Sequence, residues 1–296
     1  MTKSQPPRRT APWTSLELVK TAADFLAEKG IDNPRLDAEV LLAHVLRRDR
    51  VFLYTHFDKP LVPDEVDAYR ELIRRRTERT PTKYLIGRCE FFGLNLEVAP
   101  SVLIPRPETE FLVNAAIEAV AGNPQPIIVD LGTGSGNIAV VLAKTIPDAK
   151  VYATDISREA LDVAQRNAQR HGVEGRITFL CGDLFAPLAD ASPADLIVSN
   201  PPYVADADYE GLQPEIRLHE PPIALRAGAD GLAFFRRIAP EGRPRLKPDG
   251  VLALEMGQGQ RAAVESILAE HAFAVQKVIS DYSKIERVVV ATRKPE

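Results

Sequence analysis

Cysteine and histidine are both scarce in this sequence, and neither occurs in a pattern that binds metal. The two cysteines, Cys89 and Cys181, lie far apart in the chain. They provide neither a disulfide framework nor the paired spacing of a zinc site, so we expect two reduced packing residues. The histidines show no ligand spacing either; they are His44, His56, His171, His219 and His271. We therefore assign no metal and no histidine base.

Long apolar runs are also absent. No stretch approaches the roughly 18 apolar residues that a membrane-spanning helix needs. The first twelve residues, MTKSQPPRRTAP, are polar and proline-rich and lack the apolar segment of a secretory signal. We therefore expect a cytoplasmic protein without membrane segments. With 296 residues and a hydrophobic fraction of 45%, the chain is long enough for two units with packed cores.

Charge is unevenly distributed along the chain. The net charge is −4, but residues 1–88 carry +4 and the remainder carries −8. Helices that present both signs of charge to solvent are the common explanation of such a difference. A basic domain beside an acidic one could also steer a charged macromolecular partner.

Residues 1–88 have the periodicity of a small helical bundle. Thr14 or Ser15 suits the N-cap of a helix that stops at Gly30, and Asn33-Pro34 suits the start of a second. A third helix is predicted after Pro63-Asp64. Its arginine run is expected to lie largely toward solvent, with docking of a partner as the less favoured role; the run comprises Arg74, Arg75, Arg76 and Arg79.

The pattern changes after the helical region. Alternating apolar residues predict a β-hairpin linker over residues 89–104. From residue 105 to 296, apolar strand-like runs alternate with helical stretches, which indicates a doubly wound α/β domain with a mainly parallel sheet. The runs are Ile127–Leu131, Val151–Ala153, Ile177–Leu180, Leu196–Val198 and Val251–Leu254. The last two, Ala274–Ser280 and Arg287–Thr292, have only a short turn between them and predict an antiparallel pair.

A glycine-rich turn follows the first strand of this domain. It consists of Gly132, Thr133, Gly134, Ser135 and Gly136. Glycines let the backbone approach a ligand at the start of a helix, at the carboxyl edge of the sheet. The dinucleotide pattern would require a third glycine at position 137, where the chain has Asn137. This departure favours a ligand without phosphates and argues against a dehydrogenase.

Two acidic residues end the next two strands. Asp155 stands where a carboxylate meets ribose hydroxyls in this architecture, and Asp183 could accept an adenine amino group. Leu184 or Phe185 would then cover the ring. Each residue also has a structural interpretation: a helix N-terminal carboxylate for Asp155, a turn former for Asp183, and a core position for Phe185.

The fourth strand leads into Ser199-Asn200-Pro201-Pro202-Tyr203. Two prolines make this loop stiff. The carbonyls of Asn200 and Pro201 can accept hydrogen bonds from an –NH2 group while Tyr203 lies against its planar carrier. An amide or aromatic amine attacks poorly because its lone pair is delocalised. The predicted electrophile is a methyl group on the sulfonium of a bound cofactor. We expect the amine nitrogen to displace it in line, with positioning supplying most of the acceleration and no strong base acting before methyl transfer.

These motifs together resemble the peptide chain release factor glutamine N5-methyltransferases, the PrmC/HemK family. The resemblance covers nearly the whole chain and rests on Arg35–Glu39, Leu103–Glu110, Asp130–Gly136, Asp155 and Asn200–Tyr203. It implies a seven-stranded, Rossmann-like class I methyltransferase domain that uses S-adenosylmethionine and releases S-adenosylhomocysteine. The implied substrate is the glutamine of the Gly-Gly-Gln motif in class 1 release factors, with residues 1–88 as the docking domain.

The resemblance also assigns site residues. It implies that Gly132–Gly136, Asp155 and Asn200 contact the cofactor and that Asn200–Tyr203 hold the glutamine. Family members often have an aromatic residue where this chain has Leu184, so either Leu184 or Phe185 lines the adenine pocket. Arg106 and Glu108 would shape the site entrance, although a helix starting at Pro107 with acidic first-turn residues explains Glu108 equally well.

Two other functions fit part of the pattern. A nucleic-acid amino-methyltransferase acting on adenine N6 or guanine N2 would use the same Asn200–Tyr203 loop. The acidic catalytic half argues against a stable nucleic-acid partner, while the basic first domain keeps this alternative open. A non-catalytic scaffold would have no need of that loop. We expect a monomer.

Overall fold

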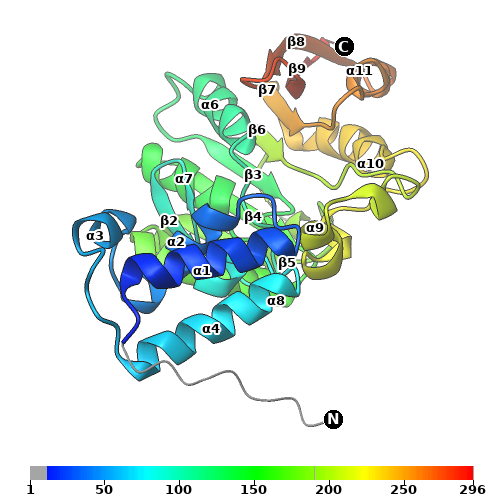
Figure 1. The fold of residues 1–296 in the computed structure, drawn as a ribbon. Coiled ribbons are helices and arrows are strands. Elements are labelled where there is room, and N and C mark those ends of the chain that lie inside the picture. Colours follow the sequence, from blue (N-terminus) through cyan, green and yellow to red (C-terminus); the bar gives the residue numbers. More distant parts are fainter. Residues whose placement is uncertain (1–11, 190, 296) are drawn as a thin grey trace. The chain divides into compact units, whose positions relative to one another are not determined.

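The computed structural model describes residues 12–189 and 191–295, which form two units (Figure 1). The first unit contains the described residues up to Ile86 together with Pro214–His219. The second contains residues 87–213 and the described residues from 220 onward. The hairpin predicted as a linker therefore belongs to the second unit. The segment Pro214–His219, which the predicted boundaries placed in the catalytic domain, packs with the helical unit.

The first unit is built from helices, as the sequence predicts. Their bounds are α1 Ser15–Glu28, α2 Pro34–Val45, α3 Arg50–Thr55, α4 Pro63–Thr77, α5 Thr82–Ile86 and α9 Pro214–His219. Thr14 caps α1: its hydroxyl accepts from the Glu17 amide, and the Glu17 carboxylate accepts from the Thr14 amide. Asn33 precedes α2 without a side-chain capping bond. The short helices α3 and α5 were not predicted because five or six residues show no helical period.

Two residues of the arginine run depart from the predicted solvated face. Arg79 is half-buried and donates to the Gly30 carbonyl at 3.0 Å and to Glu215 at 3.4 Å. Arg76 is only 6% exposed. Its guanidinium donates to Asp37 at 2.7 Å and to Glu215 of α9 at 3.0 Å. Arg74 and Arg75 do face solvent. Arg76 lies on the inner side of α4 because two buried or half-buried carboxylates neutralise it there, a long-range pairing that the local sequence does not reveal.

The second unit begins with the antiparallel hairpin of β1 Arg88–Phe91 and β2 Leu94–Glu97. A seven-stranded sheet follows, in the order β5-β4-β3-β6-β7-β9-β8, with β9 antiparallel to both of its neighbours. Its strands are β3 Ile127–Leu131, β4 Lys150–Asp155, β5 Ile177–Cys181, β6 Ala194–Ser199, β7 Leu246–Glu255, β8 Phe273–Ser280 and β9 Glu286–Arg293. The predicted parallel sheet with an antiparallel final pair is confirmed.

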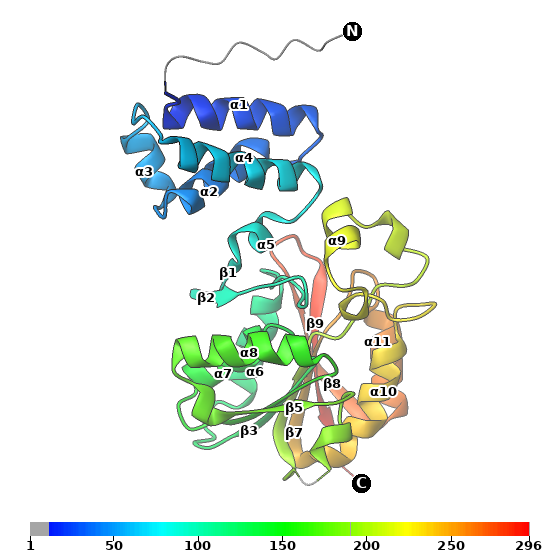
Figure 2. The same ribbon diagram turned by 90° about the horizontal axis from the view of Figure 1, so that it is seen from below.

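Helices cover both faces of this sheet (Figure 2). Their bounds are α6 Thr109–Ala119, α7 Asn137–Thr145, α8 Arg158–His171, α10 Ala233–Gly242 and α11 Arg261–Glu270. The apolar residues of α6, α7 and α8 form one core with the sheet, and those of α10 and α11 form a second core on the opposite face. The part of the chain that the structure describes also contains five short 3-10 turns: Glu174–Arg176, Ala186–Leu188, Tyr209–Gly211, Pro222–Ala224 and Arg243–Arg245. Within the residues described, no helix is long and apolar enough to cross a membrane.

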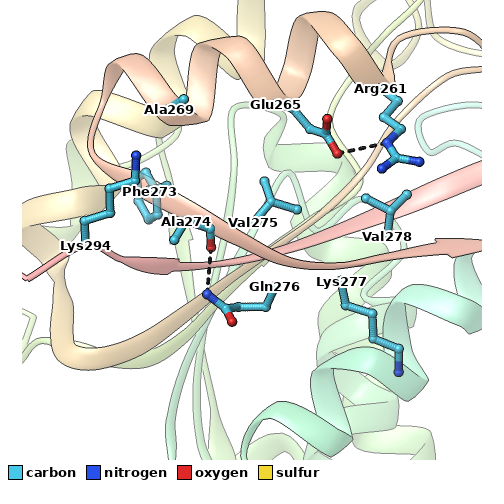
Figure 3. Close-up of a pocket in the computed structure, with 10 residues that line it drawn as sticks. All are labelled: Arg261, Glu265, Ala269, Phe273, Ala274, Val275, Gln276, Lys277, Val278 and Lys294. Carbon is cyan, nitrogen blue, oxygen red and sulfur yellow. Dashed lines mark hydrogen bonds and ion pairs between the residues drawn. The ribbon is translucent and has the colours of Figure 1, made fainter.

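The outer strand β8 ends the sheet beside α11 in a polar groove (Figure 3). Arg261 and Glu265 pair on the helix, and the Gln276 amide donates to the Ala274 carbonyl of its own strand at 3.2 Å. The pairing register also shifts between Val275 and Lys277. A charged, irregular edge of this kind resists pairing with another strand. The edge strand β8 is therefore poorly suited to pairing with a further strand.

Candidate functional site

The carboxyl ends of the parallel strands surround a cavity of about 230 Å³ in the second unit. Strand register explains why the predicted motifs meet there. Leu131 of β3 pairs with Thr154 of β4 and with Ser199 of β6, so the residues that follow these positions leave the sheet at one edge. Eight of the predicted site residues line the cavity: Gly132, Gly134, Asp155, Asp183, Leu184, Asn200, Pro201 and Pro202.

The glycine loop exposes backbone to this cavity and turns its side chains away. Gly132 and Gly134 have φ angles of +68° and +55°, which residues with a side chain rarely adopt. Thr133 and Ser135 are 2% and 1% exposed and do not line the cavity. The Thr133 hydroxyl donates to the carboxylate of Asp130 at 2.6 Å. Thr133 and Ser135 thus shape the turn, and the cavity wall itself is backbone.

Gly136 has a packing role in the same loop. A Cβ at this position would lie 3.0 Å from the Cβ of Ala164 in α8. Its φ of +78° also requires a residue that tolerates the left-handed region. Gly136 therefore lets α7 begin close to α8, and it does not line the cavity.

Asp155 reaches the cavity with its orientation already fixed. Its carboxylate accepts from the backbone amides of Gly134 at 2.8 Å and Ser157 at 2.9 Å. Burial raises its pKa, and these amide hydrogen bonds oppose the rise. Each carboxylate oxygen can accept more than one hydrogen bond, so the group retains capacity to accept from a ligand hydroxyl.

Asp183 and Leu184 form the next part of the wall. The Asp183 carboxylate accepts from Arg237 at 2.7 Å, and Arg237 lines the cavity as well. Leu184 has a φ of +46°, an uncommon value for a branched residue. Such strain persists only where surrounding contacts enforce it, and here it places an apolar side chain in the cavity.

The Phe185 side chain points away from the cavity. It is fully buried in the core on the α10 side of the sheet and does not line the cavity. Gly242 makes room for its ring, because a Cβ there would lie 3.2 Å from the Phe185 Cζ atom. The guanidinium of Arg245 lies 5.0 Å from the ring centre. The core interpretation of Phe185 thus matches its position, and Leu184 is the residue that faces the cavity.

The Asn200–Tyr203 loop divides between cavity and core. Asn200, Pro201 and Pro202 line the cavity, whereas the Tyr203 side chain packs against the α10 side core. The Tyr203 carbonyl accepts from the Gln260 side chain at 3.0 Å. Gln260 also bonds the Gly231 carbonyl and accepts from the Gly257 amide, at 3.2 and 2.8 Å. Gln260 therefore ties three backbone segments to the end of the loop.

Two buried groups lie behind Asn200. Asn200 Nδ2 donates to the Thr109 hydroxyl at 3.1 Å. Glu255, the last residue of β7, is 1% exposed. Burial raises its pKa to about 7, and the Thr109 and Tyr203 hydroxyls act against that rise. Burial, and secondly Glu255, also raises the pKa of Tyr203 to about 12.

Arg106 and Glu108 do not line the cavity. Arg106 donates to the buried carboxylate of Glu220 at 2.6 Å, and Glu220 also accepts from the Ile104 amide at 3.3 Å. The Arg106–Glu220 pair therefore joins two segments that contribute to the cavity wall: residues 101–103, which precede Arg106, and Pro221, which follows Glu220. Glu108 occupies the N-cap position of α6, so the helix begins at Thr109 and not at the predicted Pro107.

The sequence analysis missed several lining residues. They are Ser101, Val102, Leu103, Leu131, Ile156, Ser157, Ala160, Gly182, Ser199, Pro221, Ile223, Ala224, Phe234 and Arg237. Many adjoin recognised motifs and could have been included as neighbours. Pro221, Ile223, Ala224 and Arg237 reach the cavity through contacts distant in sequence, and no local pattern marks them.

Known proteins with similar sequences match this chain over nearly its whole length. A release factor glutamine methyltransferase from Geobacter sulfurreducens is 46% identical over 94% of this chain and 96% of its own length. One from Chlorobaculum tepidum is 44% identical over 93% of this chain and 96% of its own length. This chain belongs to the release factor glutamine methyltransferase family. The resemblance drawn from the motifs is therefore confirmed.

Two family models match successive segments of this member of the release factor glutamine methyltransferase family. Residues 17–87 match the PrmC N-terminal domain, and residues 108–228 match the methyltransferase small domain. Among solved structures, the hMettl16 catalytic domain in complex with the MAT2A 3'UTR hairpin 6 has a TM-score of 0.56 at 19% identity. It covers 76% of this chain and 83% of that one. A methyltransferase from Pyrococcus furiosus has a TM-score of 0.52 at 18% identity, covering 69% and 91%. Both likenesses concern the fold.

Proposed function

We propose that this chain transfers a methyl group from S-adenosylmethionine to the side-chain amide nitrogen of the glutamine in the Gly-Gly-Gln motif of class 1 release factors. One structural observation supports this proposal independently of family membership. The glycine loop, Asp155 and the Asn200-Pro201-Pro202 segment line a single cavity, although they come from three different strand ends. Cofactor and target groups can therefore meet there.

The lining residues fit S-adenosylmethionine. Gly132 and Gly134 present backbone without side chains, and Asp155 can accept hydrogen bonds from ribose hydroxyls. Leu184 gives an apolar surface for the adenine ring, and Asp183 lies beside it as an acceptor for the adenine amino group. When bound, the cofactor supplies an electrophilic methyl group on a sulfonium. The protein's contribution is to hold and orient both reactants.

The Asn200 loop is suited to an amide nitrogen. Asn200 Nδ2 is already bonded to Thr109, which leaves its Oδ1 atom as the acceptor for a substrate –NH2 group. The Pro201 carbonyl would accept the second N–H hydrogen. Two fixed acceptors favour rotation of the amide so that the nitrogen lone pair points along the line of attack. Positioning of this kind can supply several kcal/mol of the barrier reduction.

Tyr203 supports this loop from the core side. Its backbone carbonyl is held by Gln260, and its ring packs against the core below the cavity. The earlier prediction that its ring stacks on the substrate remains a prediction. A rigid loop is the feature that positioning requires, because misplacement by about 1 Å can reduce a rate by about 100-fold.

The experiment uses purified protein, S-adenosylmethionine and an intact class 1 release factor, with mass spectrometry of the Gly-Gly-Gln peptide. We expect one added methyl group on the glutamine. Asn200→Ala should reduce the rate severely, and so should Tyr203→Ala while largely keeping cofactor binding. A release factor with glutamine replaced by glutamate is the matched control. An unmodified release factor, together with methylated DNA or RNA, would instead support the nucleic-acid alternative.

We also propose that the protein acts in the cytoplasm as a monomer, with release factors as its protein partners. Within the described ranges, no cluster of three or more histidine, cysteine, aspartate or glutamate side chains could hold a metal ion. The proposed transfer uses none.

A further inference from the structure

Glu255 is a buried carboxyl whose position the proposed reaction has not yet explained. Its Oε2 atom is buried and has no hydrogen-bond partner among the residues that the structure describes. A buried acceptor without a partner costs about 1–3 kcal/mol, so its retention calls for a reason. Glu255 follows Leu254 on β7, and Leu254 pairs with Ser199, the residue before Asn200. The carboxyl therefore stands beside the start of the target loop.

The groups that face Glu255 come from three elements. Thr109 and Glu108 belong to the start of α6, Tyr203 follows β6, and Arg287 lies on β9. Of these, Thr109 and Tyr203 carry hydroxyl groups, which have a proton to donate. Thr109 is 1% exposed and also contacts Asn200. Thr109 therefore faces the carboxyl and also contacts Asn200, a side chain that lines the cavity.

The direction of these contacts determines how Asn200 is oriented. A threonine hydroxyl has one proton to donate and can accept through its oxygen. If Thr109 directs its proton to Glu255, its oxygen is left to accept from Asn200 Nδ2, as the 3.1 Å contact shows. The Asn200 Oδ1 atom is then left for the substrate. If Thr109 instead donated to Asn200, the amide would have to turn over and would present donors to the substrate –NH2 group.

We propose that Thr109 and Glu255 are positioning residues that fix the Asn200 side-chain amide with its carbonyl toward the substrate nitrogen. This inference rests on the proposed function and deepens it. It also explains the threonine of the Pro105–Glu110 segment, which the site as described leaves without a role. Neither residue lines the cavity, so each acts through Asn200.

The test compares variants that keep shape with variants that keep the hydroxyl. Thr109→Val removes the hydroxyl at similar volume, and we expect kcat to fall by about 100-fold, the scale of a positioning defect. The KM for S-adenosylmethionine and the unfolding midpoint should change little. Thr109→Ser, which retains the hydroxyl, should restore kcat to within a few fold of wild type.

Glu255→Met removes the acceptor, and kcat should fall to a similar extent. Combining it with Thr109→Val should produce no further loss, because both changes break one chain of hydrogen bonds. Multiplying losses in the double variant would overturn the proposal. So would full activity of Thr109→Val.

A second measurement does not depend on catalysis. The chain has seven asparagines, so asparagine-selective 15N labelling gives few side-chain NH2 signals, and the one lost in Asn200→Ala identifies Asn200. Thr109→Val and Glu255→Met should both move that signal to the position of an amide without the hydroxyl contact, and Thr109→Ser should not. An unmoved signal in both variants would contradict the inference. If wild-type protein leaves release factors unmodified, the proposed function fails, while this spectrum still tests the hydrogen-bond chain.

Discussion

Replacing Glu255 by glutamine should make the stability of the second unit respond differently to pH. In the folded protein burial raises the Glu255 pKa from its ordinary value of 4.5 to about 7. Between these two values the unfolded chain has released the proton while the folded chain still holds it. The folded state binds more protons in that window, so this group lowers stability as pH rises through it. One pKa unit corresponds to about 1.4 kcal/mol, which gives a cost of about 3 kcal/mol above pH 7.

Glu255→Gln is neutral at every pH and avoids that cost. Relative to wild type, its free energy of unfolding should therefore rise by about 3 kcal/mol between pH 4.5 and pH 8 and then level off. Hydrogen exchange at the amides of β6 and β7, corrected for intrinsic exchange rates, measures this locally. A difference that stays constant with pH, or that shrinks as pH rises, would refute the reasoning.

Glu71→Gln in α4 is the matched control of opposite sign. The hydrogen bond from Arg74 lowers the Glu71 pKa, so the charged form contributes stability above the ordinary value and loses it as pH falls. This exposed pair is screened by solvent, and its effect should be small. Glu71→Gln should thus be slightly less stable than wild type at pH 8 and closer to it at low pH, when followed at the α4 amides.

Two further predictions concern residues whose positions differ from a simple reading of the sequence. Arg76→Leu should destabilise the helical unit by about 3–5 kcal/mol because it leaves Asp37 without its buried cation and Glu215 with Arg79 alone, whereas the exposed Arg75→Ala should stay within about 0.5 kcal/mol. Urea unfolding followed by fluorescence of Trp13, the single tryptophan, measures both, and similar losses would contradict the assigned burial. Leu184→Ala should weaken S-adenosylmethionine binding measured by calorimetry, and its loss of stability should be smaller than that of Phe185→Ala, which should cost about 3–5 kcal/mol with binding largely kept. The reverse pattern would show that Phe185 faces the adenine ring.

Much of this fold could be predicted because its elements are marked locally. The apolar runs in residues 127–131 and 251–254 predict buried strands, and the glycine loop and Asp155 follow from the rule that ligands bind at the carboxyl edge of such a sheet. The start of α1 was predictable from Thr14 and Glu17, which cap it within one turn. In each case the determining interaction joins residues close in the sequence.

The parts that escaped prediction depend on contacts between distant residues. Arg76 looks like its neighbours in the arginine run, and only its contacts with Asp37 on α2 and Glu215 on α9 show why it is buried. The choice between Leu184 and Phe185 depends on the space that Gly242 leaves for a ring. No motif in the sequence marks Gln260 or Glu255. Both approach the Asn200–Tyr203 loop because β6 pairs with β7 and because the chain turns back after β7.

The presence of Pro214–His219 in the helical unit affects the order in which the protein can fold during synthesis. Residues 12–86 leave the ribosome well before Glu215 is translated, so Arg76 at first has Asp37 as its only described carboxylate partner. The amino-terminal unit therefore reaches its full set of ion pairs only after β3, β4, β5 and β6 have been made. A fragment ending at residue 86 would lack that final contact, and joining Pro214–His219 to it through a flexible linker is the direct way to supply the missing piece.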